Sequence, residues 1–358
     1  MNILYLISYA GKAGTEKYVE NLMRYAAAEG HTCHLGYWEG GELSEKAAAE
    51  GFPLLRLNMQ PRHIFSAAKR LADYCRENDI SVVHAQYPRE NVIAVLSRLF
   101  RPATQVVFTS HLTVRQGLVW RTVNALTTSY DKAVIAVCTP GAALLEENRV
   151  KKDRIRVIFN GVEPRPLPPR ENIIREEFSL GEDCFVFVTF ARYAPEKGLG
   201  FLLDALALLK RSTARPFVCL IAGEGEEYER IGEKIRTLGL EENVIQAGYR
   251  TDTQALLCSS DAYVSSALYN EAMSFSILEA MGCGLPLAVT DVGAGRDLAA
   301  GCGYAAPAGD VAAMAENLRR LLDDPAGSRA LGKKAYERVV SEFDLRRQMA
   351  ELLELYEK

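Results

Sequence analysis

The sequence predicts an α/β protein of two doubly wound, parallel-sheet domains, and three observations support this. Short β-branched runs alternate with longer helical patterns through the first half of the 358-residue chain, as expected for a parallel sheet covered by helices. Four prolines then fall within residues 164–169, and a stiff segment of this kind is typical of a domain boundary. Beyond it the alternation begins again, which predicts a second domain of the same type.

The first domain is expected over residues 1–163, followed by a linker at 164–172. Its strand candidates are seven apolar runs, at residues 2–8, 31–38, 53–58, 80–87, 105–111, 133–139 and 155–161. Segments 16–30 and 66–78 have apolar residues at every third or fourth position, which predicts amphipathic helices between the strands.

The second domain is expected over residues 173–342. Five strand candidates lie there, at residues 184–192, 216–223, 243–249, 261–267 and 286–293. Helical patterns occur between them at 199–211 and 226–239, and from residue 310 to the C-terminus the pattern is helical throughout. Ligands of doubly wound sheets bind at the carboxyl ends of the strands, so with two such sheets the site is expected between the domains.

The bulk composition indicates a soluble, cytoplasmic protein. Hydrophobic residues make up 48% and charged residues 25% of the chain, which is typical of soluble proteins. No apolar run is long enough for a membrane span, and residues 1–14 read as a first strand instead of a signal peptide. The eight cysteines are scattered, without a C-x-x-C pair or a histidine at metal-ligand spacing. We therefore expect reduced thiols, with neither a disulfide framework nor a bound metal.

Charge is distributed unevenly along the chain. Residues 1–165 carry a net charge of +5 and the rest −9, for a total of −4. The basic half could contact anionic lipid at the inner face of a membrane, or a phosphorylated acceptor, although ordinary surface asymmetry explains it equally well. Within it, Arg115, Trp120 and Arg121 fall in one segment, either an amphipathic, lipid-facing helix or one packed in the core; we favour the core-packed helix. No nucleic-acid partner is expected.

Glycines and histidines follow several strands of the first domain. Gly11, Gly14 and Thr15 lie where the first strand leads into a helix, so backbone N–H groups could approach an anion there. The full G-x-G-x-x-G spacing of a dinucleotide site is absent. His84 and His111 each end a strand, where a histidine can donate to a hydroxyl or to a developing negative charge. A structural role for each histidine is the competing interpretation.

Two cations follow the first strand of the second domain. Arg192 and Lys197 precede a helix that opens with glycines. An arginine fork, a lysine ammonium and a helix N-terminus together predict a clamp for a diphosphate. After the next strand, Gly223 and Gly225 could bring the backbone close to a nucleotide, but a bare turn explains them equally well.

The segment 269–286 carries two carboxylates, Glu271 and Glu279, with seven residues between them. A helix is expected to begin near Ser274 or Ser276. That start would leave Glu271 in the preceding loop and direct the first N–H groups of the helix toward an anion. The competing interpretation makes Ser276 and Glu279 an S-x-x-E capping box, with no ligand.

Together these motifs resemble the retaining glycosyltransferases of family 4, the glycosyl transferases of group 1. The matching segments span nearly the whole chain: GKAGTE, VVHA, VIFNGVE, ARYAPEKG, GEGEEYERI, SSALYNEAMSFSILEAMGCGLPLAVTDVGAGRDL and FDLRRQMAELLELYEK. The resemblance implies the GT-B fold, in which two Rossmann-like domains face each other across a cleft. It also implies that a C-terminal helix, here residues 343–358, packs back on the first domain.

The resemblance further implies roles for the site residues. Arg192 and Lys197 would hold the donor diphosphate and stabilise it as it leaves. Glu271 would contact the donor sugar hydroxyls, Glu279 the ribose, and His111 the sugar from the other domain. Other donor contacts would come from Gly14, Thr15, Gly223, Met273, Ser274, Phe275 and Ser276. The expected donor is a nucleotide-diphosphate sugar, the acceptor is a sugar, lipid-linked or other glycoconjugate hydroxyl, and no cofactor is expected.

The chain departs from the family pattern at three places. Residues 272–274 read Ala-Met-Ser where the family usually has Gly-Phe followed by Gly or Pro, which alters the floor under the sugar. Gln86 replaces the second histidine of the usual H-x-H strand end, and Asp297 stands where glutamate is commoner. No D-x-D metal motif occurs, so Arg192, Lys197 and the helix dipole would stabilise the leaving diphosphate in place of a metal ion. The resemblance implies a front-face transfer.

Two alternatives to a glycosyltransferase stay open at this point. One is another GT-B enzyme, such as a nucleotide-sugar epimerase, which would convert the donor without an acceptor. The other is a non-catalytic sugar-nucleotide-binding protein, suggested by the altered residues 272–274. A dehydrogenase is disfavoured because the dinucleotide fingerprint is missing.

Overall fold

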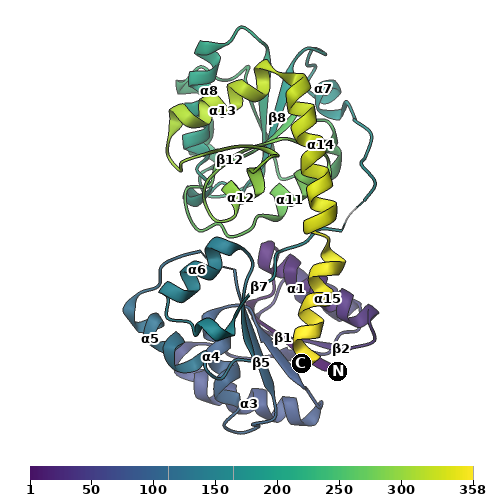
Figure 1. Ribbon diagram of the computed structural model, residues 1–358, viewed down its shortest axis with the longest axis vertical. Coiled ribbons are helices and arrows are strands. Elements are labelled where there is room, and N and C mark those ends of the chain that lie inside the picture. The colour runs from purple at the N-terminus through teal and green to yellow at the C-terminus, as the bar shows by residue number, and fades with distance from the viewer. Residues whose placement is uncertain (112, 164, 358) are drawn as a thin grey trace. The chain divides into compact units, whose positions relative to one another are not determined.

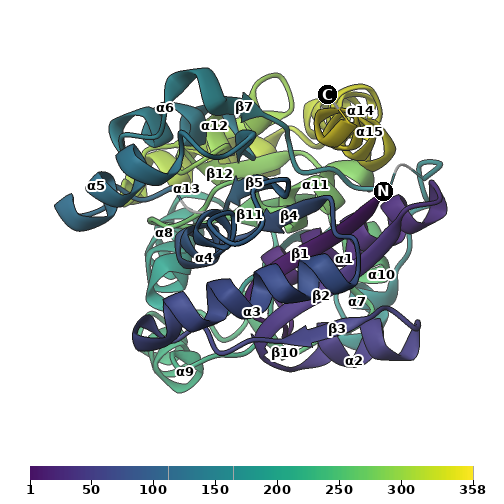
Figure 2. The ribbon, with the colours of Figure 1, turned by 90° about the horizontal axis from the view of Figure 1, so that it is seen from below.

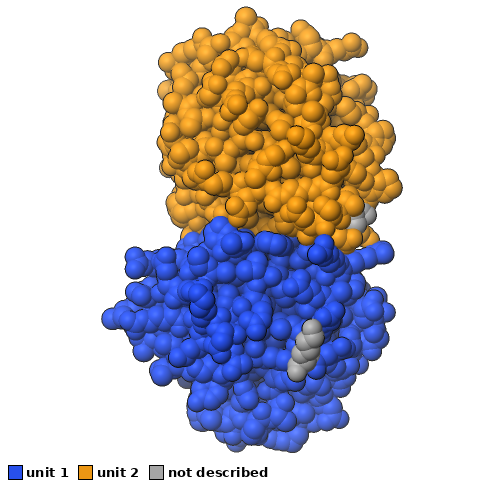
Figure 3. Space-filling view, viewed as in Figure 1, with its two compact units in different colours: residues 1–160, 346–358 blue, residues 161–345 orange. Residues whose placement is uncertain are grey.

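The computed structural model describes residues 1–111, 113–163 and 165–357. The chain forms two compact units (Figure 3): residues 1–160 with 346–358 make up unit 1, and residues 161–345 make up unit 2. The first boundary therefore lies at residue 160 instead of 163, and the second at 345 instead of 342. The expected linker, 164–172, is part of unit 2, with residue 164 itself outside the described residues.

Unit 1 is built on a seven-stranded parallel sheet covered by helices (Figure 1). The strand order is β3-β2-β1-β4-β5-β6-β7, with β1 (Asn2–Tyr9), β2 (Thr32–Glu39), β3 (Leu54–Arg56), β4 (Val82–Ala85), β5 (Gln105–Ser110), β6 (Ala133–Ala136) and β7 (Ile155–Val157). The helical elements are α1 (Gly14–Ala28), α2 (Glu42–Ala49), η1 (Pro61–His63), α3 (Ile64–Glu77), α4 (Pro88–Ser97), α5 (Leu118–Thr127), α6 (Thr139–Glu147) and η2 (Lys152–Arg154). All seven expected strands are present, because apolar runs of this length are buried on both faces of a parallel sheet.

Unit 2 contains a six-stranded parallel sheet in the order β10-β9-β8-β11-β12-β13. Its strands are β8 (Phe185–Phe190), β9 (Phe217–Ala222), β10 (Val244–Gly248), β11 (Ala262–Ser265), β12 (Leu287–Thr290) and β13 (Gly303–Ala306). Its helical elements are α7 (Ile173–Glu177), η3 (Pro195–Lys197), α8 (Leu199–Ser212), α9 (Tyr228–Thr237), α10 (Thr253–Cys258), α11 (Phe275–Gly282), α12 (Gly295–Ala299), α13 (Val311–Asp323) and α14 (Pro325–Glu342). Only β13 was not expected from the sequence.

Within the described residues, the C-terminal region from residue 311 onward forms three successive helices, which confirms the expected helical tail. Asp324 ends α13 and caps α14, because its carboxylate accepts a backbone N–H bond at 2.9 Å. Phe343 separates α14 from α15 (Leu345–Glu357), whose residues from 346 onward belong to unit 1. The Tyr356 hydroxyl lies 2.6 Å from Nδ1 of the buried His84, and Lys132 Nζ donates to the Tyr356 carbonyl oxygen at 2.9 Å. His84 therefore fastens α15 to the sheet.

Helix α5 is largely exposed, so the expectation of a core-packed helix is wrong. The exposed fractions of Leu118, Val119 and Leu126 are 68%, 76% and 67%. Asn124 is the buried residue of this helix. Among the described residues, no helix has the length and apolar character needed to cross a membrane.

The strand order reverses once in each sheet. In unit 1 the reversal falls between β1 and β4, and in unit 2 it falls between β8 and β11. Ligands of doubly wound folds bind at the carboxyl ends of the strands that flank such a reversal. Arg192 and Lys197 follow β8, and Glu271 follows β11. Arg192, Lys197 and Glu271 therefore lie at the strand-order reversal of the sheet in unit 2.

Candidate active site

The segment after β8 positions the two predicted cations. The chain turns through η3 and enters α8 at Gly198, whose φ of +63° lies in the left-handed region. A Cβ on Gly198 would lie 2.2 Å from the carbonyl oxygen of Ser266, so only glycine fits this approach to the end of β11. Arg192 forms an ion pair with Glu196, yet its side chain is 68% exposed. The turn thus presents a solvent-accessible guanidinium at the carboxyl end of β8.

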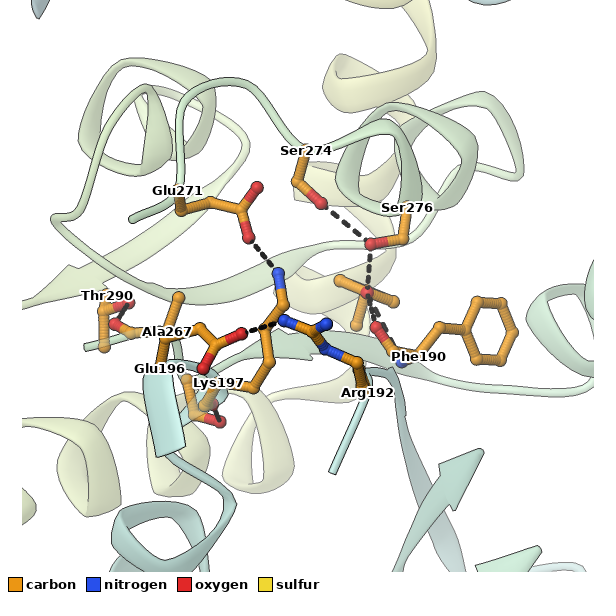
Figure 4. A network of polar contacts seen from close by, with 11 residues as sticks. Phe190, Arg192, Glu196, Lys197, Ala267, Glu271, Ser274, Ser276 and Thr290 are labelled. Carbon is orange, nitrogen blue, oxygen red and sulfur yellow. Dashed lines mark hydrogen bonds and ion pairs between the residues drawn. The ribbon is translucent and has the colours of Figure 1, made fainter. Parts of the chain in front are cut away.

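Lys197 and Glu271 bring the two main motifs into contact. The ammonium Nζ of Lys197 lies 2.5 Å from Oε2 of Glu271, and both side chains are partly buried (Figure 4). The backbone of Lys197 is fixed as well, because the Ser266 hydroxyl donates to its carbonyl oxygen at 2.8 Å. An ammonium attracts phosphate oxygens, and a carboxylate accepts hydrogen bonds from sugar hydroxyls. The pair can therefore contact both parts of a sugar diphosphate.

The loop that carries Glu271 is held in place by the chain around β12. The Thr290 hydroxyl donates to the carbonyl oxygen of Ala267 at 2.6 Å. Gly293 has a φ of +56°, and a Cβ there would lie 2.3 Å from the carbonyl oxygens of Glu271 and Ala272. Since the backbones touch at this point, the backbone of Glu271 is fixed, and its carboxylate is held by the contact with Lys197.

Helix α11 begins at Phe275, with Ser274 immediately before it. Ser276 is then already inside the first turn, so the capping-box interpretation of Ser276 and Glu279 is wrong, because that box needs its serine ahead of the helix. The Tyr263 hydroxyl instead donates to Ser276 Oγ at 2.7 Å, and the Ser274 and Ser276 hydroxyls lie 2.9 Å apart (Figure 4). Two serine hydroxyls and a helix N-terminus form an environment that suits phosphate oxygens.

Several other predicted donor residues have packing roles that the sequence did not distinguish. A Cβ on Gly223 would lie 2.0 Å from the carbonyl oxygen of Ala191, and one on Gly225 would lie 2.4 Å from that of Tyr193. These glycines let the loop after β9 pack against the segment that carries Arg192. Met273 is only 4% exposed, so its side chain belongs to the packing of the loop before α11.

In unit 1, His111 follows β5 and pairs with Gln86. The Gln86 amide N–H donates to the His84 carbonyl oxygen at 3.2 Å, and Gln86 Oε1 lies 3.0 Å from Nε2 of His111. An amide oxygen can only accept, so Nε2 of His111 carries the hydrogen and Nδ1 is the acceptor of the ring. Burial lowers the pKa of His111 to about 3, which keeps the ring neutral. The imidazole can therefore accept a hydrogen bond from a hydroxyl through Nδ1.

Gly14 and Thr15 begin α1, where the sequence placed them. The Thr15 hydroxyl oxygen accepts from the Tyr87 hydroxyl at 2.9 Å, which ties the start of α1 to the end of β4. Sequence reasoning missed Glu90, which is fully buried beside this point and accepts a hydrogen bond from Ser8. Burial raises the pKa of the Glu90 carboxyl. Because Glu90 lies in the first turn of α4, the sequence alone reads it as an ordinary helix-start acid.

The structure thus assembles two groups, one in each unit. Lys197 and Glu271 meet in unit 2, where Arg192, Ser274 and Ser276 lie close by (Figure 4). Glu279 lies further along α11, and Thr15 and His111 are in unit 1. Within the described residues, no group of three or more His, Cys, Asp and Glu side chains could hold a metal ion.

Family models match both halves of the chain. Residues 13–165 match the model described as Glycosyltransferase Family 4, and residues 170–338 match Glycosyl transferases group 1. One relative, N-acetyl-alpha-D-glucosaminyl L-malate synthase of Bacillus anthracis, is 23% identical over 295 residues, covering 79% of this chain and 76% of that protein.

A second relative comes from Escherichia coli and is named UDP-Gal:alpha-D-GlcNAc-diphosphoundecaprenol alpha-1,3-galactosyltransferase. It is 26% identical over 219 residues, which cover 59% of this chain and 56% of that protein. Among solved structures, HepE of Anabaena in complex with UDP superimposes with a TM-score of 0.88 at 19% identity, over 99% of both chains. At this identity the match shows a shared fold.

Proposed function

The chain belongs to the glycosyl transferases of group 1, with the GT-B fold, and from this premise we propose that it moves a sugar from a uridine-diphosphate sugar to a hydroxyl of a glycoconjugate acceptor. The uridine nucleotide is supported by HepE, which has been crystallised with UDP and with UDP-glucose. A lipid-linked acceptor is supported by the name of the E. coli relative, which specifies a sugar on diphosphoundecaprenol. We also propose peripheral contact of unit 1 with a membrane.

The observation that carries this proposal is the contact between Lys197 and Glu271. Lys197 Nζ and Glu271 Oε2 lie 2.5 Å apart at the strand-order reversal of unit 2, which supports a cation for phosphate beside an acceptor for sugar hydroxyls. Arg192 supplies a second, exposed cation on the same turn. The proposed assignment gives the diphosphate to Arg192, Lys197 and the first turn of α11, and the ribose to Glu279.

We propose that transfer proceeds with retention of the anomeric configuration. The bond between the sugar C1 and the diphosphate oxygen breaks, and its electron pair stays on the diphosphate. The acceptor oxygen bonds to C1 from the same face, and its proton passes to the departing phosphate oxygen. The cations Arg192 and Lys197 stabilise the negative charge that grows on the diphosphate, so no metal ion is required for this step. Nδ1 of His111 accepts a hydrogen bond from a donor sugar hydroxyl.

A ligand screen followed by product analysis tests this proposal. A ligand that binds only the folded state stabilises it by about 2.7 kcal/mol at a hundredfold excess over Kd. If the site prefers uridine, UDP at a given concentration should therefore raise the melting temperature more than GDP or ADP. NMR of the product made from a UDP-α-sugar should show an α-linkage, with turnover unchanged by a chelator. A β-linked product would contradict retention, and loss of turnover with the chelator would contradict metal independence. Conversion of the donor without an acceptor would contradict the transferase assignment.

A further inference from the structure

Helix α5 has its apolar side chains on the outside. Leu118, Val119 and Leu126 are each about two-thirds exposed or more, and Trp120 is 37% exposed. Tyr130, just beyond the helix, is 59% exposed. In Figures 1 and 2 the helix lies at the rim of unit 1. Single exposed apolar residues are common, but a group of large ones on one short helix marks an interaction surface.

The polar side of the same helix faces the protein. Asn124 is buried and its amide donates to Gln116 Oε1 at 2.7 Å and to the Asn148 carbonyl oxygen at 2.9 Å. Arg121 Nε donates to the carbonyl oxygen of Glu147 at 3.1 Å. The buried Thr128 hydroxyl accepts the N–H of Lys151 at 3.2 Å. These bonds hold the helix by its polar side, so its outward apolar side is fixed by the fold.

The charges around α5 favour a lipid surface as the occupant. From residue 91 to residue 130 the sequence contains four arginines and no acidic residue. Arg115 is exposed just before the helix, and Arg121 is partly exposed within it. The exposed Glu147 of α6 lies next to Arg121, so the unbalanced positive charge is that of Arg115. An exposed apolar face with a tryptophan and a neighbouring arginine is typical of helices that bind the interface of an anionic bilayer.

We propose that α5 is a membrane-docking helix, whose side chains Leu118, Val119 and Leu126 enter the headgroup region of an anionic bilayer. Trp120 lies at the interface, and the exposed Arg115 contacts lipid phosphates. The helix is short and its apolar face is small, so the binding is weak, reversible and reduced by salt. Docking does not depend on the proposed transfer reaction, and an inactive Lys197→Ala variant should bind vesicles as the unchanged protein does.

Vesicle co-sedimentation with the full chain tests this inference. Vesicles of phosphatidylcholine with phosphatidylglycerol should bind the protein at low salt, and phosphatidylcholine alone should bind it much less. The double variant Val119→Ser with Leu126→Ser should lose about tenfold or more in partitioning, because two inserted apolar side chains are removed. Leu208→Ser and Val340→Ser, at side chains that are 39% and 41% exposed in unit 2, are matched controls and should bind normally.

Tryptophan fluorescence gives a second measurement. The chain has two tryptophans, so a Trp38→Phe variant reports on Trp120 alone. On addition of anionic vesicles, the emission maximum of Trp120 should shift to shorter wavelength, and acrylamide should quench this emission less. Absence of binding to anionic vesicles at low salt, or binding that the α5 variant leaves unchanged, would overturn the proposal. A dimer in solution that Val119→Glu converts to monomers, without vesicle binding, would also overturn it and assign this face to a second copy of the chain.

Discussion

Lys197 and Glu271 are 74 positions apart in the chain, yet Nζ and Oε2 lie 2.5 Å apart. The two residues follow β8 and β11, which are adjacent strands of the sheet in unit 2. Adjacent parallel strands end at the same edge of a sheet, so this contact follows from the strand order. It places the cation of one motif and the carboxylate of another where a single ligand can meet both.

Replacing Lys197 by alanine should lower kcat by about a hundredfold or more, because a charge that stabilises the leaving diphosphate is lost. The melting temperature should change little, since the Lys197 side chain is partly exposed and its ion pair contributes only modestly to stability. Lys234 is a matched control, with Nζ 2.7 Å from Asp204 Oδ2 on the same unit. A Lys197→Ala enzyme as active as Lys234→Ala would contradict the role of Lys197.

Gly198→Ala should both destabilise unit 2 and weaken donor binding. The new Cβ would lie 2.2 Å from the Ser266 carbonyl oxygen and displace the turn that carries Lys197. Gly239→Ala is the control, because Gly239 has a φ of +64°, close to the +63° of Gly198, with no atom within 4 Å of the added Cβ. In both variants, holding an alanine in the left-handed backbone region lowers the free energy of unfolding by about 1 kcal/mol. Urea unfolding and UDP titration should show a larger loss only for Gly198→Ala, and equal losses would disprove the steric account.

Gln86 should fix the tautomer of His111. Nitrogen-15 NMR of labelled histidine should show the hydrogen on Nε2 at neutral pH, because Gln86 Oε1 accepts from it. In Gln86→Glu the carboxylate favours the imidazolium, so the pKa of His111 should rise from about 3. In Gln86→Leu the ring should stay neutral but lose its single tautomer, with kcat reduced. A His111 that carries its hydrogen on Nδ1 in the unchanged protein would refute this arrangement.

Acid should destabilise unit 1 through its buried histidines. Burial lowers the pKa of His84 from 6.5 to about 3. The unfolded chain binds a proton at pKa 6.5, so between there and about 3 the unfolded state binds more protons and the free energy of unfolding falls as the pH falls. The slope is up to about 1.4 kcal/mol per pH unit for each such histidine.

A His84→Gln variant gives the matched comparison. Its side chain does not titrate, so the free energy of unfolding measured across this pH range should depend less steeply on pH than in the unchanged protein. The variant should also be less stable at neutral pH, because the hydrogen bonds of His84 to Tyr356 and Thr109 are altered. An unchanged pH dependence would show that folding does not shift the pKa of His84.

The sequence predicted the architecture well because parallel strands of doubly wound folds are strongly patterned. Of the thirteen strands in the described part of the chain, twelve were expected as apolar runs, and their order predicted two sheets. Strand β13 was missed because Gly303 and the alanines beside it lack β-branched side chains. Glycine is required there, since a Cβ would lie 2.0 Å from the Leu287 carbonyl oxygen. This close contact is with the neighbouring strand β12, so the residues around Gly303 carry no sequence pattern that would predict it.

The candidate site could be predicted as a set of residues but not as a set of contacts. The spacing of Glu271 and Glu279 and a helix start near Ser274 or Ser276 were both expected, but the choice of Ser274 as the N-cap, which removes the capping box of Ser276 and Glu279, was not. Helix α5 was wrongly expected to pack in the core, because an amphipathic pattern does not show whether the apolar face points toward the protein or toward solvent. The polar face turned inward only because Asn124 finds partners elsewhere in unit 1. Hydrogen-bond partners of this kind are fixed by tertiary structure.

The central claim, that the turn after β8 holds the distal phosphate of a uridine-diphosphate sugar, is tested most directly by calorimetric titration with UDP and with UMP. These ligands differ only in the β-phosphate. We expect Arg192→Ala and Lys197→Ala each to weaken UDP binding about tenfold or more, as is typical for a lost charge-assisted hydrogen bond, and to leave the affinity for UMP unchanged. Equal losses for UDP and UMP, or an unchanged affinity for UDP, would contradict the claim.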